Sequence, residues 1–424
     1  MPTSSNGARN IITFQKYERP QTLNEAWELN QKKRNRIVAG TMWMKMGTHS
    51  FGTAIDLCDL GLNQIEETDE EFRIGAMVTL RQMEKHPGLA AYSCGAVEAA
   101  FKDIVGVQFR NGATLGGSLW RRMGFSDILT VFLAMDSYVE LYKGGIVPLE
   151  EFARMPYDKD VLVRLVVKKQ PGAFSYQAVR KQRTDIPSLN CAAAQVAGEW
   201  RVVVGSRPAR AVVLRRRHYR GKRRRVRRLR RRRRDRLGQH VGQRRIPTRT
   251  RARAHASRAS GPERGAVMEI KIKLNGTMVS DDVPADTLLI DLVRAHGCLS
   301  VKRGCETSSC GLCTVLMDDE PVLSCSTLAA RANGRSVHTL EGLQEEASEF
   351  VGFIADQGAE QCGFCNPGFV MNTIALLREN PDPSDGEILA YLSGNLCRCS
   401  GYEGQLRGIL NFLDWKKQKE AAAE

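Results

Sequence analysis

Short apolar runs alternate with amphipathic stretches over the first half of the chain. The apolar runs predict strands at residues 36–39, 53–57, 72–78 and 138–142. Apolar residues at helical spacing predict helices at residues 79–85, 89–101 and 126–135. Thr22 and Glu25 form a capping box that opens an earlier helix. This mixture predicts an α/β or α+β domain.

A second pattern begins at residue 268. Residues 269–274 alternate Lys with Ile or Leu, which predicts a half-buried strand. Asn275-Gly276 follows, a pair typical of a hairpin because both residues tolerate positive φ. A helix at residues 287–296 and a strand at residues 314–317 come next. The order strand, hairpin, helix, loop and strand is typical of a ferredoxin-type β-grasp.

The remainder of the chain is helical. Its signals are an apolar stretch at residues 350–358, Asn366 as a cap before Pro367, a capping box of Ser384 with Glu387, and an apolar face at residues 406–413. We therefore expect an α+β multidomain protein that ends in a four-helix domain.

The formal net charge of +16 comes from a single segment. Residues 215–264 hold 22 Arg and Lys222 against only Asp235 and Glu263, so the rest of the chain is acidic overall. The segment contains few apolar residues and its charges repel one another, so it cannot form a core.

We hypothesise that a shifted reading frame produced this arginine-rich segment. Arginine runs in GC-rich genes are runs of CGN codons, and a shift of one base turns them into GNC, which encodes Ala, Gly, Val or Asp. The frame would slip near Leu214, and Met268 would be the start of a second coding sequence. The alternative is a disordered basic linker that binds nucleic acid or an acidic surface. Translating the other two frames of the gene distinguishes these hypotheses.

The distribution of apolar residues also indicates the cellular compartment of the protein. Residues 1–20 have no apolar stretch of the signal-peptide kind, and no run of 18 apolar residues occurs, so we expect a cytoplasmic protein without membrane contact. Thiols stay reduced in an unsecreted protein, so clustered cysteines among the 12 Cys indicate metal binding rather than disulfides.

Eight of these cysteines form two sets with the spacing of metal ligands. Cys305, Cys310, Cys313 and Cys325 follow C-x4-C-x2-C-x11-C, and Cys362, Cys365, Cys397 and Cys399 follow C-x2-C-x31-C-x-C. The first spacing is that of plant-type ferredoxins, whose thiolates hold one [2Fe–2S] cluster. Two sets predict two clusters and therefore electron transfer. Zinc is the competing metal, mainly for the second set, because x4 followed by x2 is not a usual zinc spacing.

Residues 108–118 form a candidate phosphate-binding loop. They read QFRNGATLGGS, and the paired glycines Gly116 and Gly117 can expose backbone N–H groups to a pyrophosphate. Most Gly-Gly pairs are ordinary turns, which is the alternative for this one. No G-x-G-x-x-G follows the first strand, so a Rossmann site is not indicated.

These segments together resemble the molybdenum hydroxylases, the family of xanthine dehydrogenase, aldehyde oxidoreductase and aerobic carbon monoxide dehydrogenase. CETSSCGLC, Ser324-Cys325, QCGFCNPG and GNLCRCSGY resemble its iron–sulfur subunit, and residues 108–118 and 176–190 resemble its flavoprotein subunit. The resemblance implies five segments: an FAD-binding domain at residues 1–175, a truncated start of the flavoprotein C-terminal subdomain at 176–214, the arginine-rich segment at 215–267, a β-grasp [2Fe–2S] domain at 268–345 and a helical [2Fe–2S] domain at 346–424.

The resemblance also implies which residues contact cofactors. For FAD they are Asp127 and two loops, one of Val38, Ala39, Gly40, Thr41 and Met42, the other of Arg110, Asn111, Thr114, Leu115, Gly116, Gly117 and Ser118. The first loop lacks one glycine of the A-G-G-T/S of the family, and Ser118 replaces an Asn. Gln361 corresponds to the family glutamine that hydrogen-bonds molybdopterin.

The implied function is that of an electron-transfer component resembling that of xanthine dehydrogenase. Electrons pass from a molybdopterin-binding catalytic partner subunit, in a hetero-oligomer, through the helical-domain cluster, the β-grasp cluster and FAD to NAD⁺ or another acceptor. No side chain of this chain is expected to be catalytic, and no nucleic acid is expected as a partner. A stand-alone flavin and iron–sulfur reductase is one alternative. A nucleic-acid-binding redox sensor, based on the arginine-rich segment, is the other.

Overall fold

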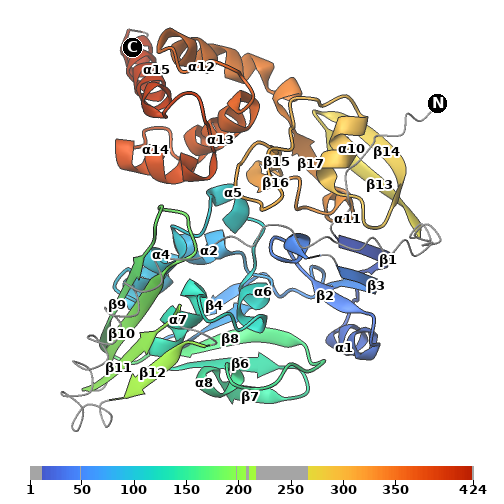
Figure 1. Cartoon of the computed structure of the whole chain (residues 1–424), viewed down its shortest axis with the longest axis vertical. Helices are drawn as coiled ribbons and strands as arrows, with labels where there is room; N and C mark the ends of the chain where they lie inside the picture. Colours follow the sequence, from blue (N-terminus) through green and yellow to red (C-terminus); the bar gives the residue numbers. More distant parts are fainter. Residues whose placement is uncertain (1–11, 48, 197, 207–209, 216–265, 423–424) are drawn as a thin grey trace, which may run out of the picture.

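The computed structural model describes residues 12–47, 49–196, 198–206, 210–215 and 266–422. Residues 216–265 of the arginine-rich segment, and with them the hypothesis of a shifted frame, lie outside these residues, whereas Arg215 and residues 266–267 are described. We name three modules: the N-terminal module (residues 12–215), the β-grasp module (residues 266–338) and the helical module (residues 339–422). Figure 1 shows the N-terminal module, in blue and green, below the other two.

Three sheets build the described part of the N-terminal module. The first is parallel, with the order β1 (Ile12–Glu18), β3 (His49–Asp56) and β2 (Arg36–Val38). The second is antiparallel, with the order β4 (Ile65–Glu67), β5 (Glu71–Gly75), β8 (Leu162–Lys168), β6 (Ser137–Leu141) and β7 (Gly145–Pro148). The third is also antiparallel, with the order β12 (Val212–Arg215), β11 (Glu199–Val204), β10 (Leu189–Val196) and β9 (Gly172–Val179).

Short helices connect and cover these sheets. They are α1 (Leu23–Gln31), η1 (Met44–Met46), α2 (Leu80–Lys85), α3 (Pro87–Tyr92), α4 (Ala96–Phe101), α5 (Val107–Arg110), α6 (Leu115–Trp120), α7 (Asp127–Ala134) and α8 (Leu149–Phe152). The predicted single helix at residues 89–101 is wrong. Cys94 and Gly95 have φ angles of 52° and 78°, left-handed values that end α3 and begin α4.

The β-grasp module is a mixed sheet with one main helix, as its pattern predicts. The sheet order is β14 (Thr277–Pro284), β13 (Val267–Leu274), β17 (Ser336–His338), β15 (Thr314–Met317) and β16 (Glu320–Leu323). The helices are α10 (Leu289–Ala295) and the short α11 (Ala329–Ala332). The hairpin between β13 and β14 turns at Asn275 and Gly276, whose φ angles are 49° and 85°.

The helical module follows through the short turn η3 (Leu340–Gly342). Its helices are α12 (Gln344–Asp356), α13 (Asn366–Glu379), α14 (Asp385–Tyr391), the short η4 (Leu392–Gly394) and α15 (Glu403–Ala421). The capping box of Ser384 and Glu387 is confirmed at α14. The predicted cap at Asn366 is wrong by one residue, because Cys365 is the N-cap of α13 and makes no side-chain cap.

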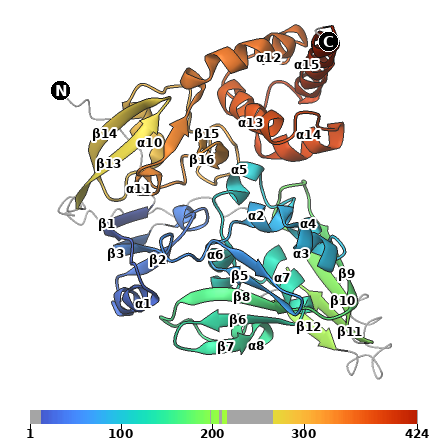
Figure 2. The ribbon, with the colours of Figure 1, turned by 180° about the vertical axis from the view of Figure 1, so that it is seen from behind.

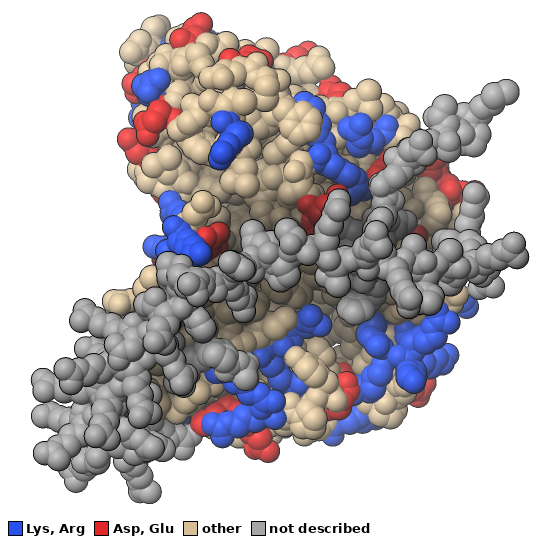
Figure 3. All heavy atoms as spheres, viewed as in Figure 1, with Lys and Arg blue, Asp and Glu red and all other residues tan. Residues whose placement is uncertain are grey.

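The N-terminal and β-grasp modules pack against each other through a shared apolar core. One continuous cluster of buried apolar side chains includes Phe14 and Phe51 of the N-terminal module and Ala285 and Leu328 of the β-grasp module. Figures 1 and 2 both place α5 at the junction where the three modules meet. On the face in Figure 3, uncharged atoms cover most of the helical module, and groups of both charge signs lie over the N-terminal module. In the described part of the chain, no helix has the length and apolar character needed to cross a membrane.

Candidate functional site

The first cysteine set lies largely in the interior of the β-grasp module, with Cys305 partly exposed. Cys305, Cys310 and Cys313 lie on the loop between α10 and β15, and Cys325 follows β16. Cys310, Cys313 and Cys325 are buried, with exposed fractions of 7%, 2% and 2%. Their thiols are paired: Cys305 contacts Cys310, and Cys313 contacts Cys325. The hydrogen bond with Cys310 lowers the pKa of Cys305 to about 4.

The second cysteine set lies at the surface of the helical module. Cys362 and Cys365 precede α13, and Cys397 and Cys399 lie on the loop between η4 and α15. These thiols are paired as well, with Cys399 Sγ 3.5 Å from Cys362 Sγ and Cys365 in contact with Cys397. Cys362 and Cys399 are exposed, and so is Gln361 beside them. The two sets therefore differ in access, one enclosed and the other open.

The chemistry of the donor sets fits a two-iron cluster at each position. A [2Fe–2S] cluster takes two thiolates on each iron, whereas a structural zinc ion takes four ligands around one centre. Each set presents two thiol pairs. Within the described residues, no group of three or more His, Cys, Asp or Glu side chains is gathered around a single ion position.

The two cysteine loops touch each other directly. The N–H of Leu396, the residue before Cys397, donates a hydrogen bond of 2.9 Å to the carbonyl oxygen of Cys310. Lys302 lies across the same contact, with its Nζ 3.4 Å from the carbonyl oxygen of Phe364 and 5.0 Å from the centre of that ring. One hydrogen bond thus joins the backbones of the two sets.

The two loops predicted to bind FAD also meet. A Cβ atom at Gly40 would lie 1.6 Å from the carbonyl oxygen of Gly112, so only glycine permits this approach. Thr41, the residue after Gly40, has φ 53°, a left-handed value that is uncommon for residues other than glycine. Thr41 Oγ1 also donates a hydrogen bond to the carbonyl oxygen of Ser326 in the β-grasp module.

The expectation that the paired glycines expose N–H groups is wrong. The N–H of Leu115 donates to Val78, that of Gly116 to Ala76 and that of Gly117 to the hydroxyl of Thr114. Thr114 is the N-cap of α6, and Ser118 Oγ donates to its carbonyl oxygen. The glycines serve packing instead, because a Cβ at Gly116 would lie 2.8 Å from Ala76.

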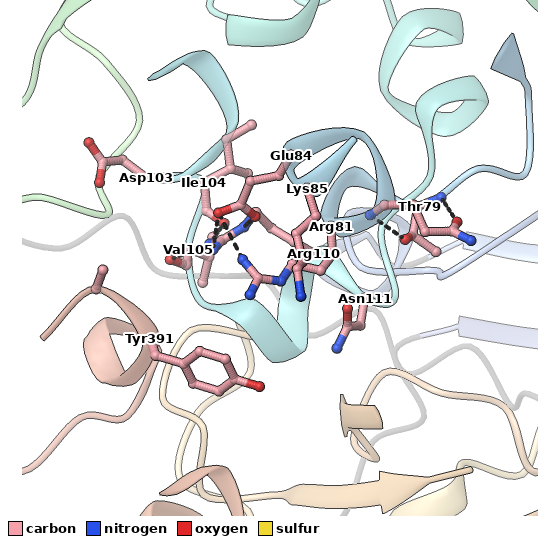
Figure 4. A network of polar contacts seen from close by, with 12 residues as sticks. Thr79, Arg81, Glu84, Lys85, Asp103, Ile104, Val105, Arg110, Asn111 and Tyr391 are labelled. Carbon is pink, nitrogen blue, oxygen red and sulfur yellow. Dashed lines mark hydrogen bonds and ion pairs between the residues drawn. The ribbon is translucent and has the colours of Figure 1, made fainter. Parts of the chain in front are cut away.

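The side chains of Arg110 and Asn111 both form hydrogen bonds with protein groups. The Arg110 guanidinium is buried against Glu84, with Nε 2.7 Å from Oε2, and it also donates to the carbonyl oxygens of Ile104 and Val105 (Figure 4). Burial lowers the pKa of Arg110, and Glu84 opposes this shift. Asn111 donates to the carbonyl oxygen of Pro321, 2.9 Å away. Both side chains position the loop.

Asp127 is likewise occupied by protein groups. Its carboxylate accepts hydrogen bonds from the Tyr176 hydroxyl and from Asn190 Nδ2, the latter at 3.0 Å, and lies 2.9 Å from Arg180 Nη2. Burial and the Asp127 charge raise the pKa of Tyr176. The carboxylate therefore joins α7 to the third sheet, and we propose that this contact, rather than one with FAD, is its role.

Replacing Asp127 with asparagine tests this assignment. The change leaves the Arg180 guanidinium buried without a counter-charge, and breaking such a pair costs about 3 kcal/mol. We expect a lower urea midpoint, measured by far-ultraviolet circular dichroism. Asp103→Asn is the control, because the Asp103–Arg183 pair is exposed and contributes about 1 kcal/mol or less. Loss of flavin with an unchanged midpoint would instead assign Asp127 to FAD.

Several contacts at the junction were missed by sequence reasoning. Lys45 Nζ lies 2.9 Å from Cys325 Sγ, and Gln108 Nε2 lies 3.1 Å from the carbonyl oxygen of Gly394. Arg331 pairs with the fully buried Asp56 at 3.0 Å. Trp43, Met44 and Met46 flank Lys45 in the sequence, but Trp43 and Met46 are themselves exposed, and nothing in the sequence identifies the partner of Lys45.

Three family descriptions match the chain. "FAD binding domain in molybdopterin dehydrogenase" matches residues 12–169, "2Fe-2S iron-sulfur cluster binding domain" matches residues 272–336, and "[2Fe-2S] binding domain" matches residues 339–410.

Relatives of known function match the iron–sulfur part. The chain is 43% identical over 136 residues to the nicotinate dehydrogenase small FeS subunit of Eubacterium barkeri, covering 31% of this chain and 87% of that protein. It is 42% identical over 147 residues to the xanthine dehydrogenase iron–sulfur-binding subunit of Escherichia coli O157:H7, covering 34% and 92%.

Among solved structures, quinoline 2-oxidoreductase of Pseudomonas putida 86 is 36% identical, with 36% of this chain and 98% of that chain covered and a TM-score of 0.34. Carbon monoxide dehydrogenase of Hydrogenophaga pseudoflava is 20% identical, with 47% and 77% covered and a TM-score of 0.44.

The domain matches and the identity to small iron–sulfur subunits define the class of protein: an oxidoreductase component with one FAD-binding domain and two [2Fe–2S] domains. The chain belongs to the molybdenum hydroxylase family, as an electron-transfer component.

Proposed function

We propose that this chain carries electrons from a molybdopterin-binding catalytic subunit to NAD⁺ in a hydroxylase that acts on xanthine or a related heterocycle. When bound, the clusters transfer single electrons and the flavin collects them for a two-electron acceptor. The chain holds these groups in order and supplies no acid or base to the oxidation of substrate.

The observation that supports this proposal is the difference in solvent exposure between the two cysteine sets. The exposed set, Cys362, Cys365, Cys397 and Cys399, would hold the cluster that faces the partner, with Gln361 beside it toward the molybdopterin. Phe364, Leu396 and Tyr402 are exposed near these thiols, at 49%, 45% and 43%, and form an apolar rim that a partner subunit could cover.

The enclosed set, Cys305, Cys310, Cys313 and Cys325, would hold the second cluster, next to the N-terminal module. The loops of residues 38–42 and 110–118 would hold FAD on the other side of that junction, with Asp127 and Arg110 supporting the fold around it. The direct contact of Leu396 with Cys310 supports this order, because it joins the two cluster loops.

Co-expression of the full chain with its neighbouring genes tests the proposal. We expect about four Fe and one FAD per chain and molybdenum in a separate polypeptide that co-purifies. About two Fe, or bound zinc, would contradict the two-cluster assignment. Reduction of NAD⁺ by the purified complex with xanthine tests the acceptor and the substrate. NAD(P)H-dependent dye reduction by the chain alone, with no co-purifying subunit, would favour the stand-alone reductase.

A further inference from the structure

Lys45 is a buried lysine whose hydrogen-bond acceptor is a cysteine of the other module. It lies in η1, three residues after the loop of residues 38–42, and 3% of its surface is exposed. Its Nζ lies 2.9 Å from Cys325 Sγ, across 280 positions of sequence. Within the described residues, no carboxylate forms an ion pair with it.

A buried ammonium group is stable only beside negative charge. Transferring the ammonium group of a lysine from water into the protein interior costs several kcal/mol. Attraction to a nearby negative charge can offset this desolvation cost. A neutral thiol at Cys325 would not supply that charge, whereas a thiolate bound to iron would, because metal-bound thiols are deprotonated. Lys45 Nζ is therefore placed to donate a hydrogen bond to Cys325 Sγ when that sulfur is an iron-bound thiolate.

The surroundings of Cys325 hold Lys45 in this orientation. Thr41 donates to the carbonyl oxygen of Ser326, and Ser326 Oγ lies 3.5 Å from Cys325 Sγ and 2.7 Å from Ser308 Oγ. Two contacts between the N-terminal and β-grasp modules therefore lie beside this sulfur, one from Thr41 to Ser326 and one from Lys45 to Cys325. Of the groups that contact this sulfur, Lys45 comes from the N-terminal module, whereas Cys313 and Ser326 belong to the β-grasp module.

We propose that Lys45 is a positioning residue through which the N-terminal module raises the reduction potential of the β-grasp cluster. The inference rests on the proposed function, since it takes Cys325 as an iron ligand. Hydrogen bonds to cluster sulfurs and nearby positive charge both stabilise the reduced form, which carries one more negative charge. Electrons arriving from the helical-module cluster are thereby favoured on the cluster beside the flavin loops.

Redox titration of the full chain, followed by electron paramagnetic resonance, tests this inference. Cys325→Ser identifies the signal of the β-grasp cluster by its loss. For Lys45→Met we expect that cluster to be about tenfold harder to reduce at a fixed potential, about 59 mV for a one-electron couple, with the other cluster unchanged. Lys45→Arg keeps the positive charge, so we expect the reduction potential of the β-grasp cluster in this variant to lie close to the wild-type value. Lys271→Met is the control, because Lys271 is exposed and pairs with Glu269.

The outcomes separate the inference from the proposed function. If the wild-type chain shows no pair of [2Fe–2S] signals, the proposed function fails. If it shows both signals and Lys45→Met moves neither of them, or moves both equally, the inference is overturned. If Lys45→Met fails to assemble the β-grasp cluster, Lys45→Gln is titrated in its place, since glutamine keeps a donor without the charge. Lys45→Ala, which keeps neither the donor nor the charge, is titrated beside it, and a wild-type potential in Lys45→Ala overturns the inference.

Discussion

Replacing Cys325 with serine is expected to remove the β-grasp cluster and to leave the helical-module cluster intact. Iron should fall from about four to about two per chain, with one of the two paramagnetic signals lost. Cys325 is 2% exposed and its thiol is in contact with that of Cys313, so the change removes one member of a buried thiol pair. A serine oxygen is a harder donor than a thiolate and gives up its proton less readily than a thiol, so it is a weaker ligand for the cluster.

Cys298→Ser is the matched control for this prediction. Cys298 is also buried, at 4% exposed, and lies in the same module, but it belongs to neither set and accepts a hydrogen bond from Asn275. We expect its iron content to equal that of the wild type, measured by a colorimetric iron assay. Full iron in Cys325→Ser, or an equal loss in both variants, would refute the ligand assignment.

The sequence was sufficient where the determining signal is local. The hairpin at Asn275-Gly276 and the capping box at Ser384 depend on residues within a few positions of each other, and both are confirmed. The family motifs are local as well, which is why the domain content could be predicted. The break between α3 and α4 was missed because Cys94 adopts a left-handed conformation that its residue type does not signal.

The roles of polar side chains could not be predicted in this way. Arg110 lies in a motif that resembles an FAD loop, yet its partner Glu84 is 26 residues away. Asp127 is bound by Tyr176, 49 residues later, and Lys45 by Cys325, 280 residues later. Such partners follow from sheet register and module docking, which a pattern of apolar residues does not determine. A motif position therefore does not determine which protein groups its side chain contacts.

Replacing Gly40 with alanine is expected to separate the two loops at the proposed flavin site. The new Cβ would lie 1.6 Å from the carbonyl oxygen and 2.5 Å from the carbonyl carbon of Gly112, so backbone must move. Overpacking of this kind costs about 2 kcal/mol or more, equivalent to at least about tenfold weaker flavin binding. Flavin per chain, measured by absorbance after gel filtration, should fall while iron stays at about four.

Gly112→Ala is the matched control, because it adds the same methyl group to the other residue of the contact between Gly40 and Gly112. Its Cβ would lie 2.0 Å from Met42 Cε, the far end of a flexible side chain, and 3.7 Å from the nearest backbone oxygen. Met42 can rotate away, so we expect this variant to keep most of its flavin. Equal flavin content in the Gly40 and Gly112 variants would show that the loop contact does not shape the site. Joint loss of iron and flavin in Gly40→Ala would indicate that the modules depend on each other for folding, since the two loops lie beside the seam that Thr41 and Ser326 close.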